Sequence, residues 1–444
     1  MKHNVIYLHS HDTGRYIAPY GHAIATPNLQ RLAEEGVLFR QAFSAAPTCS
    51  PSRAALLTGQ SAHSSGMLGL AHRGFSLTHP EQHLAAYLKN AGYRTVLAGF
   101  QHVGAGGEEE KLGYAEVDRD LPAEEAAAAF LGSSPREPFF LDVGFVETHR
   151  KGRGFNEQEP TDAGAHVQVP PVLPDTPEVR SDMASYQVAA ERLDHKVGVV
   201  LNALEASGLA DKTLVIFTTD HGIAFPHMKG TLSDHGIGVA LIMRGPGGFA
   251  GGKAVDALVS HIDLFPTLSE VLGLPKPEHL EGTSLLPLIT GDAQAVREDL
   301  FAEVTFHAAF EPKRAVRTRR WKYIRRWCER SRPVLANVDD SPSKDLLLAH
   351  GWDTREVAEE ALFDLVYDPL EFENLATQDA YQATLQEMRE RLTGWMKDTN
   401  DPLLTGNLPV PEGVNVNPVD DISPSEPGVP WHNTPEARAY TQDE

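Results

Sequence analysis

Short apolar runs that alternate with helical segments constrain the fold of this chain more than any other feature. Between the runs, residues 179–207 carry apolar side chains at helical spacing, and residues 27–35 form another helix candidate that ends at Gly36. This alternation predicts an α/β fold, with one large, mixed and mostly parallel β-sheet flanked by helices on both faces. The clearest runs are residues 5–8, 95–99, 139–146, 213–217 and 239–243.

Polar residues follow several of these runs directly. Functional sites in open α/β sheets lie at the carboxyl ends of the strands, so we expect these side chains to meet. Carboxylates and imidazoles gathered in one place are suited to binding a divalent cation. The residues concerned are His11 and Asp12, His102, His149, and Asp220 with His221.

Cys49, one of only two cysteines, marks a second candidate feature. Ser50 is suited to cap a helix and Pro51 to its first turn, so we expect a helix that begins here and continues through residues 54–57. Cys49 would then lie at the positive end of the helix dipole, with Arg53 one turn further on. This position suits either an oxyanion substrate or an activated thiolate of the phosphatase type.

The character of the sequence changes near residue 297. We predict a catalytic domain at residues 1–296 and a smaller C-terminal α+β subdomain with an antiparallel sheet at residues 297–401. The basic stretch at residues 313–330 is expected to form a solvated face of that sheet. The expected strands are residues 302–307, 315–318 and 321–325, and the expected covering helix is residues 378–398.

Residues 402–444 form a Pro-rich, extended C-terminal arm with eight prolines and few apolar side chains. A segment of this composition does not fold by itself, so it must lie on another surface. We expect that surface to belong to a neighbouring subunit, which predicts a homo-oligomer.

The net charge of −22 limits the partners that the chain can bind. It argues against nucleic acid and against an anionic membrane surface, and it suits a small anionic substrate better than a highly charged polymer. No apolar stretch is long enough to cross a bilayer, and residues 5–8 are too short for the core of a secretory signal. We therefore expect a cytoplasmic protein.

The string Cys49-Ser50-Pro51-Ser52-Arg53, followed by Leu57-Thr58-Gly59, resembles the signature of type I sulfatases in the alkaline phosphatase superfamily. The resemblance implies an alkaline phosphatase-like fold, and it implies that a formylglycine-generating enzyme oxidises Cys49 to formylglycine. It also implies the reaction. The hydrated aldehyde attacks the sulfur of a sulfate ester or N-sulfate, the alcohol or amine leaves, and sulfate is then expelled as the aldehyde returns.

The same resemblance implies one divalent cation. Type I sulfatases hold Ca2+ or Mg2+ between an Asp-Asp pair after the first strand and an Asp-Asn or Asp-His pair near the middle of the chain. Here these places match His11, Asp12, Asp220 and His221. His11 departs from the pattern because it replaces the first Asp. Ca2+ is the ion that the family implies, whereas an imidazole is better suited to Mn2+ or Zn2+ than to Ca2+ or Mg2+.

Three further residues take roles from the resemblance. His102 matches the base that restores the aldehyde, in a segment where other members read Gly-Lys-Trp-His and this chain reads Gly-Phe-Gln-His. Phe100 thus replaces a lysine near the nucleophile, which leaves more of the positive charge to Arg53. His149 and Lys229 match residues that contact the sulfate and the leaving group.

Within the family, the chain is most similar to the heparan N-sulfatase (sulfamidase) branch, through residues 174–177, 222–226 and 303–305. This similarity implies a sulfated saccharide as substrate, with Glu303 and His307 reaching from the small subdomain to the sugar. Two alternatives stay open. One is a phosphodiester or phosphonate monoester hydrolase of the same superfamily, and the other is a catalytically weak sulfate-binding homologue.

Overall fold

Strand β1 (Asn4–His9) lies inside the larger of two main sheets, and all six of its residues are buried. The computed structural model describes residues 2–155 and 166–440. All strand pairs of the eight-stranded sheet are parallel except those of β7, which runs antiparallel to both of its neighbours. The order is β4 (Glu116–Asp118), β3 (Arg94–Gly99), β5 (Phe139–Gly144), β1, β6 (Thr213–Thr218), β7 (Leu241–Arg244), β2 (Val37–Phe43) and β8 (Lys253–Ser260).

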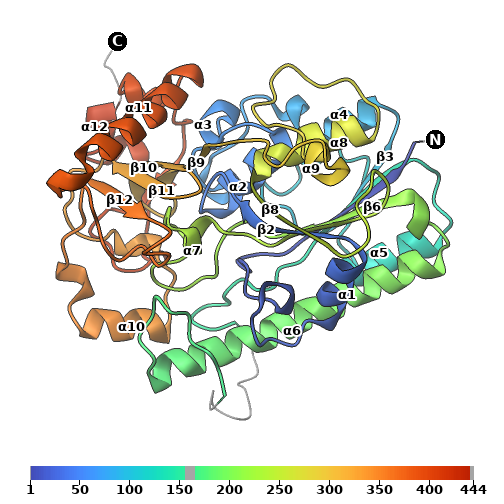
Figure 1. The fold of residues 1–444 in the computed structure, drawn as a ribbon, viewed down its shortest axis with the longest axis horizontal. Coiled ribbons are helices and arrows are strands. Elements are labelled where there is room, and N and C mark those ends of the chain that lie inside the picture. The colour runs from blue at the N-terminus through green and yellow to red at the C-terminus, as the bar shows by residue number, and fades with distance from the viewer. Residues whose placement is uncertain (1, 156–165, 441–444) are drawn as a thin grey trace.

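Different helices cover the two faces of this sheet (Figure 1). Successive side chains on a strand alternate, so Ile6 and Leu8 of β1 face one side while Val5 and Tyr7 face the other. The predicted fold class, a mostly parallel sheet between two helical layers, is confirmed. One layer contains α1 (Pro27–Glu35), α5 (Ala123–Gly132) and α6 (Pro177–Ala206), and the other contains α2 (Cys49–Thr58), α4 (Leu84–Asn90), α8 (Leu264–Val271) and α9 (Leu286–Thr290).

The long helix α6 begins two residues before the point that its apolar spacing predicts. Thr176 caps it by accepting a hydrogen bond from the N–H of Val179, and Pro177 occupies the first turn, where a missing N–H costs nothing. Asp194 ties α6 to the start of α1, because its carboxylate accepts from the N–H of Leu29 (2.8 Å). In the described part of the chain, none of the helices combines the length and the apolar character that crossing a membrane requires.

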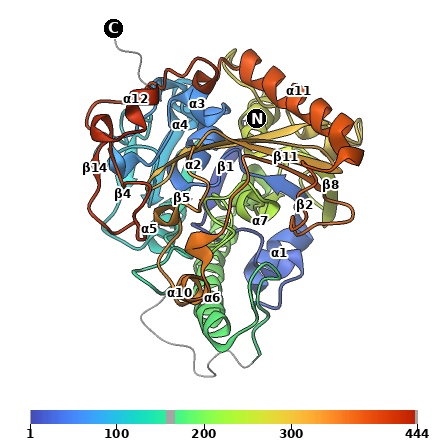
Figure 2. The same ribbon diagram turned by 90° about the vertical axis from the view of Figure 1, so that its left-hand side faces the viewer.

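A second sheet, of four antiparallel strands, lies beside the first, with α11 (Gln382–Asp398) packed across it (Figure 2). The apolar face of α11 is buried through Leu385, Met388, Leu392 and Met396. The strand order is β12 (Glu360–Asp364), β11 (Trp321–Arg326), β10 (Phe310–Arg317) and β9 (Leu300–Phe306), and α10 (Pro342–Ala349) lies in the connection between β11 and β12.

The basic residues of the small sheet are not all solvated, in contrast to the sequence expectation. Arg314 and Lys322 have no exposed surface. Arg314 pairs with Asp401 (2.6 Å), and Lys322 pairs with Glu371 (2.9 Å). The prediction of a solvated basic face is wrong for these residues, because buried carboxylates take the place of water around them.

The C-terminal segment, residues 402–440, packs on its own chain. The ring of Trp431 meets the rings of Phe306 and Phe310 at centroid distances of 4.9 and 5.0 Å. The N–H of Asn417 donates to the carbonyl of Ala308 (2.8 Å). The prediction that this arm lies on a neighbouring subunit is wrong, because its apolar side chains find their partners in the small sheet. The segment contains β13 (Asn415–Val416), β14 (Val429–Pro430) and α12 (Ala437–Tyr440).

Replacement of the buried indole tests this packing. We expect Trp431→Ala to lower the free energy of unfolding by about 3 to 5 kcal/mol, because it leaves a cavity between two aromatic rings. Ile422→Ala in the same segment is the control, since Ile422 is 52% exposed and should change stability by less than about 0.5 kcal/mol. Urea unfolding of the full chain measures both, and equal effects of the two substitutions would contradict the packing.

Candidate functional site

The predicted polar residues meet at one edge of the large sheet. Strands β3, β5, β1 and β6 are neighbours, and their carboxyl ends are followed by His102, His149, Asp12 and Asp220 respectively. Parallel strands point the same way, so these four residues arrive at the same edge. The expectation that they converge is confirmed by the contacts described below.

Helix α2 carries Cys49 to this edge. The helix begins at Cys49 itself, with Thr48 as its N-cap, so the prediction that Ser50 caps it is wrong. The hydroxyl of Ser50 instead accepts from the N–H of Ala71 (3.0 Å). Ser52 donates to the carbonyl of Asp220 (2.5 Å), which joins the first turn of α2 to the end of β6.

The carboxylates of Asp12 and Asp220 form the centre of the site. Lys229 Nζ lies 2.8 Å from Asp12 Oδ2, and Arg53 Nη2 lies 3.0 Å from Asp220 Oδ2. His11 Nδ1 lies between the two acids, 2.7 Å from Asp12 Oδ1 and 3.3 Å from Asp220 Oδ2. All five side chains are almost completely buried. Two fixed cations therefore hold two acids from opposite sides.

The surroundings keep both acids ionised. Burial alone would raise the pKa of Asp12, but Lys229 and the neighbouring histidines hold it well below its usual range. Burial alone would also raise the pKa of Asp220, but His221 and Arg53 lower it below its usual range. Burial lowers the pKa of His11 to about 4, so its imidazole is neutral at neutral pH. Neutral imidazoles and ionised carboxylates are the forms that bind metal ions.

These donor atoms fit a divalent cation. One ligand atom each from His11, Asp12, Cys49 and Asp220 lies within 4.8 Å of the others. His221 Nε2 is close to the same group, 3.3 Å from Asp12 Oδ1 and 3.4 Å from Cys49 Sγ. Carboxylate oxygens suit any divalent ion, and the imidazole nitrogens suit transition ions best.

The thiol of Cys49 is not activated by this environment. Burial raises its pKa well above the usual range, in spite of the positive charges of Lys229 and Arg53. A thiol that keeps its proton is a poor nucleophile. The raised pKa therefore does not favour the activated thiolate that the sequence left open.

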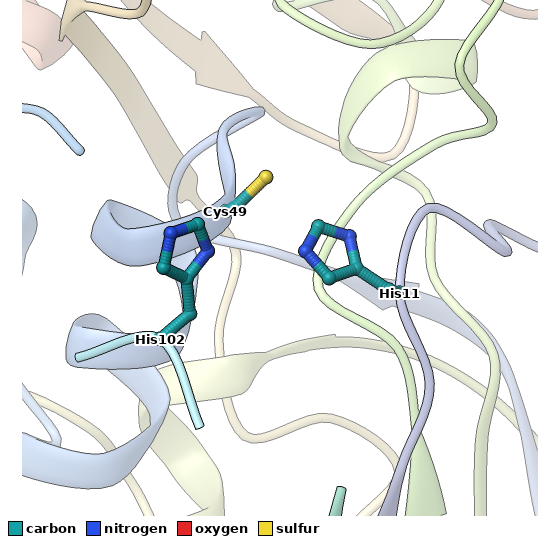
Figure 3. Close-up of side chains that lie close together, drawn as sticks. All are labelled: His11, Cys49 and His102. Atoms are coloured by element: carbon teal, nitrogen blue, oxygen red, sulfur yellow. The ribbon is translucent and has the colours of Figure 1, made fainter. Parts of the chain in front are cut away.

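The imidazoles of His11 and His102 lie beside Cys49 (Figure 3), in addition to that of His221. Nδ1 of His102 is buried and has no hydrogen-bond partner within the described residues. On its other side, His102 Nε2 lies 3.1 Å from Nδ1 of His72, and the two rings stack. His149 meets His11 edge-on, with ring centroids 4.4 Å apart. Sequence reasoning missed His72, because no strand end or motif marks it.

Phe100 lies among these rings, at the place where the family pattern has lysine. Its centroid is 5.5 Å from that of His11 and 5.3 Å from that of His102, and the guanidinium of Arg53 lies 5.8 Å away. Phe100 thus places an apolar ring beside these imidazoles, in agreement with the missing positive charge that the sequence predicts.

The small subdomain contributes one more acid to the site. Asp339 Oδ2 lies 3.1 Å from Lys229 Nζ, opposite Asp12. Burial opposes ionisation of Asp339, but the charge of Lys229 lowers its pKa to about 2. His307 is buried nearby, and burial together with the charge of Lys229 lowers its pKa to about 3. Asp339 also escaped prediction, since it belongs to an irregular connection without a recognisable pattern.

Glu303 is not brought together with these residues. Its Oε1 lies 2.9 Å from His63 Nδ1, its Oε2 lies 3.1 Å from Arg314, and the side chain is 1% exposed. Asp401 completes this separate buried cluster. The expectation that Glu303 contacts the sugar is not supported, because its carboxylate is engaged by two cationic groups inside the protein.

Several solved structures share the fold of this chain. A protein crystallised with its substrate D-glucosamine-2-N,6-O-disulfate matches with a TM-score of 0.68, over 90% of this chain and 99% of that one, at 18% identity. The phosphonate monoester hydrolase of Agrobacterium radiobacter gives 0.67, over 90% and 96%, at 21% identity. At such identities the likeness shows the fold alone. The chain thus shares their fold, which agrees with the alkaline phosphatase-like fold that the sequence resemblance implies.

Sequence comparison identifies the family to which the chain belongs. Residues 3–274 match the Sulfatase family, and residues 227–347 match the C-terminal part of N-sulphoglucosamine sulphohydrolase. The chain belongs to the sulfatase family. Human N-sulphoglucosamine sulphohydrolase is 31% identical to it, over 93% of this chain and 92% of that protein. The predicted family is confirmed, and the chain is a hydrolase of sulfuric esters.

The cluster around Glu303 gives a test that separates stability from catalysis. We expect Glu303→Gln to lower the free energy of unfolding by about 3 to 5 kcal/mol, because it removes a buried negative charge that Arg314 and His63 share. The Michaelis constant of the folded enzyme should not change. Glu298→Gln, on the exposed surface, is the control. A raised Michaelis constant at unchanged stability would instead place Glu303 at the sugar.

The loss of stability caused by Glu303→Gln should depend on pH. Burial opposes ionisation of Glu303, but His63 and Arg314 lower its pKa from 4.5 to about 2, so its contribution is complete above pH 4.5 and disappears toward pH 2. Burial also opposes protonation of His63, but Glu303 raises that pKa above 6.5, so this contribution is complete below pH 6.5 and fades at higher pH. The stability difference should be largest between pH 4.5 and 6.5.

Proposed function

We propose that the enzyme removes the sulfate group from a small sulfated saccharide, with N-sulfated glucosamine as the first candidate. The similarity to human N-sulphoglucosamine sulphohydrolase supports this choice, as does the match of residues 227–347 to the C-terminal part of that protein. An N-sulfate and an O-sulfate both present a tetrahedral anion to the site, so the choice between them depends on the leaving group.

One observation carries the proposal: Cys49 starts a buried helix directly beside the ionised pair Asp12 and Asp220. We propose that a formylglycine-generating enzyme converts Cys49 to formylglycine. Hydrated formylglycine supplies the hydroxyl that attacks sulfur. The buried position of α2 holds residue 49 in one place, and the positive end of the helix dipole favours the sulfate oxygens.

A divalent cation is the second component of the proposal. Asp12, Asp220, His11 and His221 would hold it, and it would supply positive charge toward the sulfate oxygens. Electrostatics supports its presence, because three acids, Asp339 included, face two fixed cations among the described residues. Without further positive charge the site would repel a sulfate. Ca2+ follows from the family resemblance, and the nitrogen donors favour Mn2+ or Zn2+.

The remaining residues divide the proton transfers. His102 is suited to take a proton from residue 49, because its unpartnered Nδ1 faces the space beside Cys49. His149 is the exposed imidazole of the group, so it can reach an incoming leaving group. Lys229 remains charged between Asp12 and Asp339. These roles, the homo-oligomer and the cytoplasmic location stay predictions from the sequence.

Mass spectrometry tests the nucleophile. We expect the peptide that contains Cys49, from protein made in its native host, to be lighter by about 18 Da than the unmodified peptide, because oxygen replaces sulfur and two hydrogens are lost. Cys49→Ala should lower turnover by about 10^4-fold or more while the fold is kept. Cys328→Ala is the control, because Cys328 lies elsewhere and is only partly buried. An unconverted Cys49, or an active Cys49→Ala variant, would overturn the mechanism.

A panel of substrates tests the reaction. We expect the highest kcat/KM on N-sulfoglucosamine, lower values on 6-O-sulfated glucosamine and aryl sulfate, and the lowest on a phosphonate monoester or phosphodiester. A preference for the phosphonate or the phosphodiester would favour the alternative hydrolase. Binding of sulfate without turnover of any compound would favour the sulfate-binding homologue.

A further inference from the structure

A chain of three buried polar side chains lies directly behind Arg53. It consists of His9, Asp142 and Tyr114, which are exposed by 3%, 1% and 2%. His9 ends β1 and Asp142 lies in β5, and the register pairs β1 with β5 side by side. Both side chains point to the face of the sheet that α2 covers, because Tyr7 and Phe140, two residues earlier in each strand, belong to that core.

The contacts define the protonation of His9. Arg53 Nη1 lies 2.5 Å from His9 Nδ1, and a guanidinium can only donate, so Nδ1 must accept. The ring proton is therefore on Nε2, which lies 2.9 Å from Asp142 Oδ1. Tyr114 donates its hydroxyl to the other oxygen, Asp142 Oδ2. Arg53 thus donates to His9, Tyr114 donates to Asp142, and the Nε2 of His9 faces the carboxylate of Asp142 between them.

Arg53 is held at both ends of its guanidinium. Nη2 donates to the carbonyl of Ser10 (2.8 Å) and to Asp220 Oδ2 (3.0 Å), while Nη1 donates to His9. Two contacts on Nη2 alone would let the planar group tilt about them. The third contact, from Nη1 to His9, fixes the plane of the guanidinium. That plane determines the position from which Nη2 donates to Asp220.

Packing alone does not require polar side chains at positions 9, 142 and 114. The same face of the sheet is otherwise apolar, with Val5, Leu97 and Phe140 among its buried residues. Burial of an imidazole, a carboxylate and a phenol costs free energy unless each finds a partner. Tyr7 stacks on His9 at 4.8 Å and fixes the orientation of the ring. An aliphatic side chain at position 9 would fill the space at a lower cost.

We propose that His9, Asp142 and Tyr114 are positioning residues that orient Arg53 and, through it, Asp220. This inference rests on the proposed role of Asp220 at the cation and extends it to the residues behind the site. His9 supplies the acceptor, Asp142 holds the tautomer that makes it an acceptor, and Tyr114 holds Asp142. Residues that orient metal ligands typically affect metal affinity or activity by about 10- to 100-fold.

Three substitutions test the proposal in the full chain. His9→Leu removes the acceptor, and His9→Asn returns an amide oxygen near the position of Nδ1. Val143→Ala is the control, because Val143 is a buried neighbour of Asp142 that faces the opposite side of the sheet. Calorimetric titration of chelator-treated protein with Ca2+ and with Mn2+ gives the cation affinity, and steady-state rates on sulfated glucosamine give kcat/KM.

We expect His9→Leu to lower cation affinity and kcat/KM by about 10- to 100-fold, and His9→Asn to restore part of both. Val143→Ala should lower the melting temperature and leave both quantities unchanged. If His9→Leu behaves like Val143→Ala, the proposal is wrong. If His9→Leu does not fold, Tyr114→Phe decides, since it removes one hydroxyl at almost constant volume. For Tyr114→Phe, a loss of about threefold in cation affinity or in kcat/KM supports the proposal, and no loss in either overturns it.

The two measurements, cation affinity and kcat/KM, also distinguish a failure of this inference from a failure of the proposed function. Cation affinity reports on Arg53 and Asp220 even if the native enzyme turns over none of the sulfated sugars. In that case the proposed substrate fails, and the role of His9 is still decided by the titration. If the native enzyme binds neither cation but turns over a sulfate, kcat/KM of the same variants decides it.

Discussion

Burial of two ionised carboxylates is the constraint on which the rest of this structure depends. Asp12 and Asp220 lie at the ends of adjacent strands, where their like charges repel and water is excluded. Lys229 and Arg53 compensate from opposite sides, at 2.8 and 3.0 Å. The surrounding elements serve this arrangement. The sheet brings the acids together, α2 brings Arg53 and Cys49, and the loop after β6 brings Lys229.

The small subdomain completes the site from outside. Asp339 gives Lys229 a second partner, and His307 is buried beside that pair. The subdomain is itself anchored by buried charge, through Arg314 with Asp401 and Glu303. The C-terminal segment adds an apolar anchor, since its Trp431 packs into the aromatic residues of β9 and β10. Ion pairs and aromatic packing thus stabilise the small subdomain internally, while Glu303 with His63 and Asp339 with Lys229 join it to the catalytic half.

Local patterns explain which parts could be predicted. Apolar runs and helical spacing are properties of consecutive residues, and they predicted the large sheet and helices such as α1 and α6. Polar residues directly after a strand predicted the meeting of Asp12, Asp220, His102 and His149. The N-terminal limit of α2 was misplaced, because Ser50 finds its partner in Ala71, far from the helix start.

Pairings between distant residues could not be predicted in this way. His72 and Asp339 lie in irregular segments, and only the fold brings them to His102 and Lys229. Glu303 looked available for a sugar because nothing in its neighbourhood reveals that His63 and Arg314 engage it. The arm seemed to need another subunit because its few apolar residues are scattered along the sequence. Their partners in the small sheet lie about a hundred residues away.

The sequence by itself determined the α/β architecture, the sulfatase signature at Cys49 to Arg53, and the acids and imidazoles at the strand ends. These are local properties, since strand and helix patterns and motif spacing are read within a few residues. Only the tertiary structure decided that burial raises the pKa of Cys49, that Arg53 is held between Asp220 and His9, and that Glu303 is engaged elsewhere. The reason is physical, because burial and charge pairing depend on which distant side chains share the same interior space.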